Sequence, residues 1–190
     1  PFTLPTSVAT YGSGYFDGSG DYLTVSSSAG VSGTGAFTVE FWAYLTTSQS
    51  YSRPVSGSAN QFTIDLSSSG EINYGKSGVN NIISSNVGTV LGAWCHIVVA
   101  RSSGGTARIW ANGTSIGTAT DSNNYTAGTV YIGSTSVPNF YLTGYISNLR
   151  ITNTDVYGTS NTTITVPTTL LTAVSGTSLL TTQYNGAGNN

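Results

Sequence analysis

The run Phe37 to Leu45 constrains the fold of this chain more than any other segment, because its side chains alternate strictly between two classes. In an extended strand, alternate residues point to opposite faces. One face of this run is wholly apolar and carries Phe37, Val39, Phe41, Ala43 and Leu45. The other face carries Thr38, Glu40, Trp42 and Tyr44. An apolar face of this length belongs in a core, so the run predicts one strand of a sandwich.

The composition supports strands rather than helices. The 190 residues include 24 Gly and 12 Tyr, no Met, and only 6% are charged. Glycine is a poor helix former, whereas aromatic residues and Thr suit the pleated surface of a strand. Sandwiches of about 200 residues commonly form one domain. We therefore expect one main domain that is all-β.

The charge pattern argues against two classes of partner. The formal net charge is −2, and neither sign is gathered into a run that could attract a phosphate backbone, so nucleic acid is not expected as a partner. No apolar stretch approaches the roughly 20 residues that span a bilayer, so membrane insertion is not expected either. A surface dominated by hydroxyl and amide groups suits a virion surface or an extracellular setting. The absence of Met leads us to expect a segment of a longer polypeptide.

The single Cys and the single His are adjacent, at Cys95 and His96. Neighbours in a strand point to opposite faces, so the two cannot easily form a nucleophile and base pair. One His also cannot supply the ligand cluster of a zinc site. We expect Cys95 to be a small buried side chain and His96 to be structural, hydrogen-bonded near its strand.

Turn signals divide the rest of the chain into short strands. Asn112-Gly113 lies between two alternating runs and favours the positive φ angles of a type I′ hairpin turn. Other strands are predicted at 21–26, 61–66, 71–74, 81–84, 129–133 and 144–151.

Several of these segments, in their order, resemble a known family. They are Phe16-Asp17-Gly18 with Asp21-Tyr22-Leu23, the strand Phe37 to Leu45, Trp94 with His96, Trp110 to Gly113, Tyr131-Ile132-Gly133 and Gly144 to Ile151. Together they resemble the laminin-G-like, concanavalin A-like jelly-roll modules. The resemblance implies an antiparallel two-sheet jelly-roll β-sandwich over residues 14–157. Residues 1–13 are then a linker or edge segment, and 158–190 an extension that packs on the sandwich or leads to a further module.

The C-terminal region resembles a narrower group. The stretch from Leu170 to Gln183 looks like the extension that follows such modules in structural proteins of marine bacteriophages. This resemblance implies a module of a phage fibre, tail or capsid-surface protein, present in many copies and therefore multivalent.

Catalysis is not expected. Some relatives in this superfamily are glucan hydrolases, which need two carboxyl groups on either side of the scissile bond. Glu40 has no acidic partner two or four positions along its strand, and Glu71 has none nearby either. The Glu-x-Asp-x-x-Glu pattern of the related glucanases is also missing, so we predict a non-enzymatic protein.

Calcium is the one cofactor that the resemblance raises, because laminin-G-like modules often hold one such ion through oxygen ligands. Asp17 and Asp21 are the candidate metal ligands, and the alternative is that both only cap turns through backbone N–H groups. Many relatives carry an acidic pair where this chain has Ser147-Asn148, which is a departure from the family pattern.

For ligand binding, the predicted rim loops offer amides beside aromatic rings, the chemistry that neutral sugars require. The candidate residues are Tyr51, Asp121, Asn123, Asn124, Tyr125, Asn139 and Tyr141. Substitution of Tyr125 or Asn124 is predicted to spare folding, whereas loss of Trp42 or Trp94 should damage it. The alternative is that these aromatics pack locally within solvated loops. The favoured function is recognition of cell-surface glycans, and the alternative is virion decoration or fibre assembly through contacts with neighbouring virion subunits.

Overall fold

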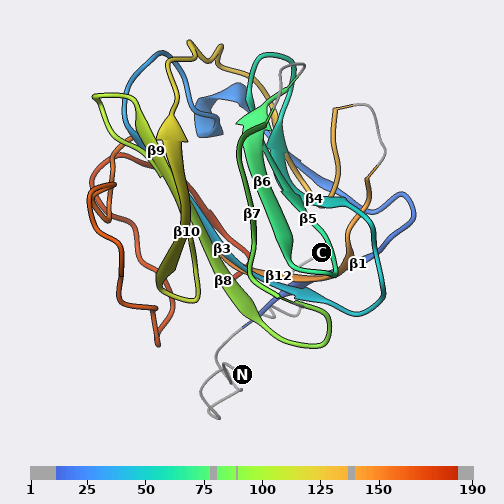
Figure 1. Ribbon diagram of the computed structural model, residues 1–190. Helices are drawn as coiled ribbons and strands as arrows, with labels where there is room; N and C mark the ends of the chain where they lie inside the picture. Colours follow the sequence, from blue (N-terminus) through green and yellow to red (C-terminus); the bar gives the residue numbers. More distant parts are fainter. Residues whose placement is uncertain (1–11, 78–80, 89, 137–139, 184–190) are drawn as a thin grey trace.

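The computed structural model describes residues 12–77, 81–88, 90–136 and 140–183, which form two facing layers of strands (Figure 1). The elements, in chain order, are β1 Gly14–Asp17, β2 Leu23–Val25, the 3-10 turn η1 Ser27–Ala29, β3 Phe37–Leu45, β4 Ser52–Gly57, β5 Phe62–Leu66, β6 Glu71–Lys76, β7 Asn81–Asn86, β8 Cys95–Arg101, β9 Thr106–Ala111, β10 Thr114–Thr120, β11 Val130–Ile132, β12 Thr143–Thr152 and β13 Thr177–Thr181. Within these described ranges, no helix has the length and apolar character needed to cross a membrane.

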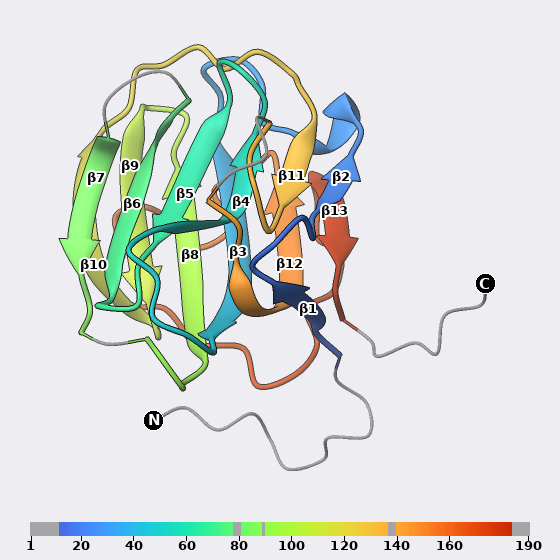
Figure 2. The same ribbon diagram turned by 90° about the vertical axis from the view of Figure 1, so that its right-hand side faces the viewer.

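The strands form one seven-stranded and one six-stranded sheet. The first has the order β1-β12-β3-β8-β9-β10, with β13 also paired to β12, and the second has the order β2-β11-β4-β5-β6-β7. Neighbouring strands pair antiparallel in both sheets. The edge strands β1, β2 and β13 lie at one side of the sandwich, and β7 and β10 at the other (Figure 2). The predicted all-β, two-sheet jelly-roll sandwich is confirmed.

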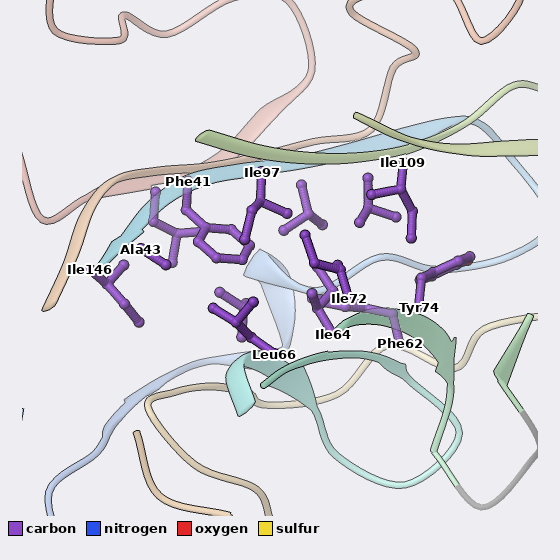
Figure 3. Packing of buried hydrophobic residues seen from close by; sticks show 14 of the residues in the cluster. Phe41, Ala43, Phe62, Ile64, Leu66, Ile72, Tyr74, Ile97, Ile109 and Ile146 are labelled. Carbon is purple, nitrogen blue, oxygen red and sulfur yellow. The ribbon is translucent and has the colours of Figure 1, made fainter. Parts of the chain in front are cut away.

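The core lies between the two sheets, as the alternation of β3 predicts. The five apolar side chains of that strand are each at most 1% exposed. They face an apolar layer from β5 and β6 that includes Phe62, Ile64, Leu66 and Ile72, with Ile97, Ile109 and Ile146 beside them (Figure 3). Full burial of such side chains contributes about 1.5–3 kcal/mol each, which makes this layer the main source of stability.

Two local expectations are confirmed by the backbone. Asn112 and Gly113 have φ angles of 47° and 83°, and Ala111 pairs with Thr114 on either side of them. Two positive φ values at a two-residue loop are the signature of a type I′ hairpin. Cys95 is buried in the inter-sheet core, whereas His96 points the other way and lies against Trp42, with ring centroids 4.8 Å apart.

The side-chain nitrogens of His96 make no hydrogen bond among the described residues, although Nε2 lies 3.6 Å from Glu40 Oε2. The hydrogen bond that we expect near this strand is made by the backbone instead. The backbone N–H of His96 donates to Asn112 Oδ1, at 2.9 Å.

Three strands were not predicted: β1, β4 and β13. Strand β1 has only four residues and forms by pairing with β12. Strand β4 contains Pro54, which cannot donate to a ladder, and its register with β5 shifts between Ser52 and Val55. A proline inside a sheet is tolerated at such an irregularity. Strand β13 consists mainly of Thr, Ser and Leu and is a strand because it pairs with β12.

The segment 153–176, here called the C-terminal strap, runs from β12 to β13 across the outer face of the seven-stranded sheet, the face turned away from the six-stranded sheet (Figure 1). Trp110 Nε1 donates to the carbonyl of Asn161 at 3.0 Å, and Ile164 packs on the outward cluster of Val98, Ala100 and Trp110. The second face of β3 is therefore largely buried as well, which its polar residues did not suggest.

A charged cluster fixes the strap to the sheet. Glu40 is fully buried, bonds to the Arg150 guanidinium, and accepts a hydrogen bond from the Tyr157 hydroxyl of the strap. Burial acts to raise the pKa of Glu40, but its neighbours His96, Tyr157 and Arg150 lower it more strongly, so the carboxyl keeps its charge. A buried carboxylate with these partners specifies where the strap lies.

Candidate functional site

The predicted ligand residues Asp121 and Tyr125 lie inside the protein, each only 2% exposed. Asp121 Oδ2 accepts hydrogen bonds from the hydroxyls of Tyr74 and Tyr125, and it lies 3.3 Å from Arg101 Nη1. The ring of Tyr125 stands edge-on to Phe37 at 5.9 Å. These two side chains cannot touch a ligand at the surface in this structure, which corrects our expectation of their exposure.

Hydrogen bonds from its neighbours stabilise the buried carboxylate of Asp121. Burial acts to raise the pKa of its carboxyl, but hydrogen bonds from Tyr74, Asn123 and Tyr125 outweigh burial and lower it. Asn123, half-buried, donates its side-chain N–H to Asp121 Oδ1 at 2.7 Å. The carboxylate of Asp121 thus holds Asn123 and Tyr125 of the same loop in place.

The remaining predicted residues are not brought together. The exposed Asn124 uses its carbonyl to accept a bond from Lys76 Nζ, at the end of β6 that pairs with Phe62. Tyr51, 41% exposed, donates to Glu71 Oε2 at 2.8 Å, at the opposite end of β6. Tyr141 is half-buried.

Asn139 lies outside the described residues. The predicted set is therefore divided between two ends of the sandwich, and its role in binding stays a prediction.

The candidate calcium ligands form a turn. Asp17 Oδ1 accepts the backbone N–H of Ser19 at 2.7 Å, and Asp21 Oδ2 accepts that of Asp17 at 3.3 Å. Calcium takes six to eight oxygen ligands, and the described residues contain no group of three or more His, Cys, Asp or Glu suited to a metal. Two turn-capping carboxylates are a poor fit to that requirement, so calcium there stays a prediction.

A different set of residues does converge on one surface. Tyr15 pairs with Tyr145 across β1 and β12, and Tyr145 pairs with Tyr44 across β12 and β3. Trp94 directly precedes Cys95, the residue that pairs with Ala43, so it continues the same lateral row. Four aromatic side chains from four neighbouring chain segments thus lie side by side on the outer face of the seven-stranded sheet.

The rings are close enough to form a single platform. The centroid distance is 5.0 Å between Tyr15 and Tyr145, 6.1 Å between Tyr145 and Tyr44, and 5.5 Å between Tyr44 and Trp94. These spacings fall in the range of favourable tilted and edge-to-face contacts, which hold each ring in place.

A groove opens beside this platform. Its volume is about 380 Å³, and its lining consists of Ser13, Tyr44, Thr46, Trp94 and Tyr145. We call this the aromatic groove. The described lining residues carry three aromatic rings, two hydroxyl groups and no charge. Such rings can stack on the flat apolar face of a ligand, and the hydroxyl groups can hydrogen-bond to its polar edge.

Only part of this groove had a signal in the sequence. Tyr44 falls on the polar face of β3, but our sequence interpretation placed Trp94 among the fold residues, although it is half-buried and lines the groove. Trp42, two residues before Tyr44 on the same face, is only 2% exposed.

Comparisons with known proteins bear on the fold. Residues 17–157 match the model of the Laminin_G_3 family, described as the concanavalin A-like lectin/glucanases superfamily. No curated protein sequence matches the chain significantly.

Among solved structures, a putative carbohydrate binding protein from Bacteroides ovatus is similar with a TM-score of 0.70 and 12% identity, over 92% of this chain and 52% of that one. Domains LG4-5 of the mouse laminin α1 chain are similar with a TM-score of 0.61 and 15% identity, over 97% of this chain and 48% of that one. A CBM40 of the Ruminococcus gnavus IT-sialidase, bound to α2,3 sialyllactose, is similar with a TM-score of 0.57 and 11% identity, over 75% of this chain and 96% of that one. At these identities the likeness shows a shared fold, and this chain spans about half of the first two chains.

Proposed function

The chain belongs to the Laminin_G_3 family of the concanavalin A-like lectin/glucanases superfamily, and on that premise we propose that it is a non-enzymatic module that binds glycans through the aromatic groove. The observation that carries the proposal is the row of Tyr15, Tyr145, Tyr44 and Trp94. The apolar face of a pyranose ring stacks on such side chains, while Ser13 and Thr46 supply hydroxyls for its polar rim.

The relatives support this assignment by their ligands. The similar Bacteroides ovatus protein is described as a putative carbohydrate binding protein, and the Ruminococcus gnavus module holds sialyllactose. Fold alone does not fix function, so the proposal depends on the groove of this chain.

The acidic residues support a binding role over hydrolysis. Hydrolysis of a glycosidic bond requires a pair of carboxyl groups about 5 to 9.5 Å apart at the sugar. The described residues that line the aromatic groove include no Asp or Glu, and Glu40, on the same outer face, is buried beneath the strap with Arg150 and Tyr157. A sugar in the groove would meet the rings and hydroxyls of these lining residues.

A multivalent glycan-array screen, with and without calcium, tests the proposal. We expect Tyr145→Ala and Trp94→Ala to lose binding while the unfolding temperature shows that each variant is folded. Asn124→Ala and Tyr51→Ala are matched controls from the predicted rim loops and should bind as the parent does. If the two controls lose binding and the groove variants keep it, the site lies in the loops and the groove assignment is wrong.

We propose in addition that the module works in a virion or another extracellular assembly, where many copies turn a weak single-site affinity into firm attachment. The alternative is an assembly module without a glycan ligand. One observation favours that alternative. Strand β13, built from the extension, pairs only with β12 among the described strands and so offers a free edge to a neighbour. Sedimentation of the pure protein, beside the glycan array, tests the form of this alternative in which β13 pairs with another copy of the chain, because that form predicts self-association without glycan binding.

A further inference from the structure

A second hollow is lined by residues of β1 and β2 and of the turn between them. The two strands lie at the same side of the sandwich (Figure 2). The volume of this hollow is about 250 Å³, and its lining consists of Gly14, Tyr15, Phe16, Asp21, Tyr22 and Leu23. We call this the edge pocket. Tyr15 lines the edge pocket and also contacts Tyr145, which lines the aromatic groove. The contact between Tyr15 and Tyr145 therefore links the two hollows.

The side chain of Tyr15 is unusually accessible for an aromatic residue. Tyr15 is 55% exposed, and beyond it Tyr22 and Leu23 are 40% and 48% exposed. The ring of Tyr131 lies 6.3 Å from that of Tyr22 and supports it from the neighbouring strand β11. Exposed large apolar side chains that adjoin one another mark interaction surfaces more often than isolated ones do.

The row of rings is longer than one sugar. Tyr15 and Trp94 lie three strand positions apart, and neighbouring strands are spaced about 4.8 Å, so their backbones are about 14 Å apart. Beyond Tyr15, the edge pocket leads from β1 towards β2 of the six-stranded sheet. A single pyranose ring covers only part of this length, so several units are needed to fill both hollows.

The charges restrict the ligand further. Among the described residues that line the two hollows, the only charged side chain is that of Asp21. Its carboxylate would repel a sialic acid or a sulfated sugar. A cationic partner is the usual means of binding an anionic sugar, and the described lining residues include no Lys or Arg.

We propose that the aromatic groove and the edge pocket are two subsites for one uncharged oligosaccharide, which crosses Tyr15 and is recognised along its chain rather than at a charged terminal unit. This inference rests on the proposed function, since it specifies the ligand of the same groove. It assigns to Tyr15 a bridging contact and to Tyr22 the stacking contact of the second subsite.

Calorimetric titration with neutral glucose, mannose and N-acetylglucosamine oligosaccharides, from monosaccharide to hexasaccharide, tests the inference. We expect affinity to rise at least tenfold between the monosaccharide and the longer chains. Tyr22→Ala should weaken the binding of long chains about fivefold to tenfold, as loss of one aromatic contact implies, and leave short ones unchanged. Trp94→Ala should abolish the binding of both, and Tyr51→Ala, which removes an exposed Tyr elsewhere, should change neither.

The outcomes separate the two proposals. If the parent binds equally well to monosaccharides and long chains, and Tyr22→Ala has no effect, the two-subsite inference fails while the glycan-binding function stands. Tighter binding of 3′-sialyllactose or a sulfated oligosaccharide than of any neutral chain would overturn the charge argument. If the folded parent binds no saccharide at all, the proposed function itself is refuted.

Discussion

The substitution Tyr125→Ala tests whether a residue that looks like a loop contact is part of the core. The side chain is 2% exposed, its ring packs edge-on against Phe37, and its hydroxyl donates to Asp121. Removal of a buried aromatic ring costs about 3–5 kcal/mol, so we expect Tyr125→Ala to lower the free energy of unfolding by about 4 kcal/mol. Tyr125→Phe keeps the ring and loses only the hydrogen bonds around the carboxylate, which should cost about 2 kcal/mol.

Urea unfolding followed by tryptophan fluorescence measures both changes. A loss of 4 kcal/mol corresponds to a fall of about 2 M in the midpoint for a typical urea dependence. Asn124→Ala is the matched control, because it lies in the same loop, its side chain is exposed, and its bond to Lys76 uses the backbone carbonyl. If Tyr125→Ala unfolded at the same urea concentration as Asn124→Ala, the buried placement of Tyr125 would be refuted.

Three further predictions concern the core and the backbone. The pKa of Glu40 lies below its ordinary value of 4.5, so the stability that its charge contributes is present above that pH and is lost on acidification. As the pH is lowered from about 4.5, the unfolding temperature of the parent should therefore decrease, and that of Glu40→Gln should decrease less steeply. Gly70 and Gly20 share a φ of +86°, but only at Gly70 would an added Cβ lie 1.4 Å from a backbone oxygen, that of Gly88. In urea unfolding, Gly70→Ala should therefore cost about 1–3 kcal/mol more than Gly20→Ala. Equal costs would contradict the close approach. Burial raises the pKa of the Cys95 thiol to about 12, so iodoacetamide should label it only after denaturant is added, and labelling of the native protein would show that this strand opens.

The covered outer face has a consequence for ligand binding. The strap covers the outer surface where Val98 and Trp110 contact it and where it bonds to Glu40 of β3 and Arg150 of β12, whereas the aromatic groove lies at the ends of β3 and β12 that carry Tyr44 and Tyr145. A ligand of this outer face is therefore expected at the end of the strands that the strap leaves uncovered. The charged cluster at Glu40 holds the strap in that position.

Features that depend on neighbouring residues were predictable from the sequence. The alternation of Phe37 to Leu45 predicted strand β3 with its correct bounds and its buried face, and Asn112-Gly113 predicted the hairpin between β9 and β10. Both signals arise from backbone preferences that act over a few residues. The turn and strand pattern, together with the family resemblance, was sufficient for the two-sheet fold.

The location of the site was decided by tertiary structure. Tyr125 and Tyr15 look alike in the sequence, as tyrosines next to turn residues, yet one is 2% and the other 55% exposed. The difference arises from partners far along the chain: Tyr74 and Phe37 enclose the first, and Tyr145 aligns the second with Tyr44. Cross-strand register and the path of the strap are set by non-local pairing, which no local pattern encodes. The sequence by itself thus determined the sandwich and its inner face, whereas only the folded chain determined which aromatic rings remained at the surface together.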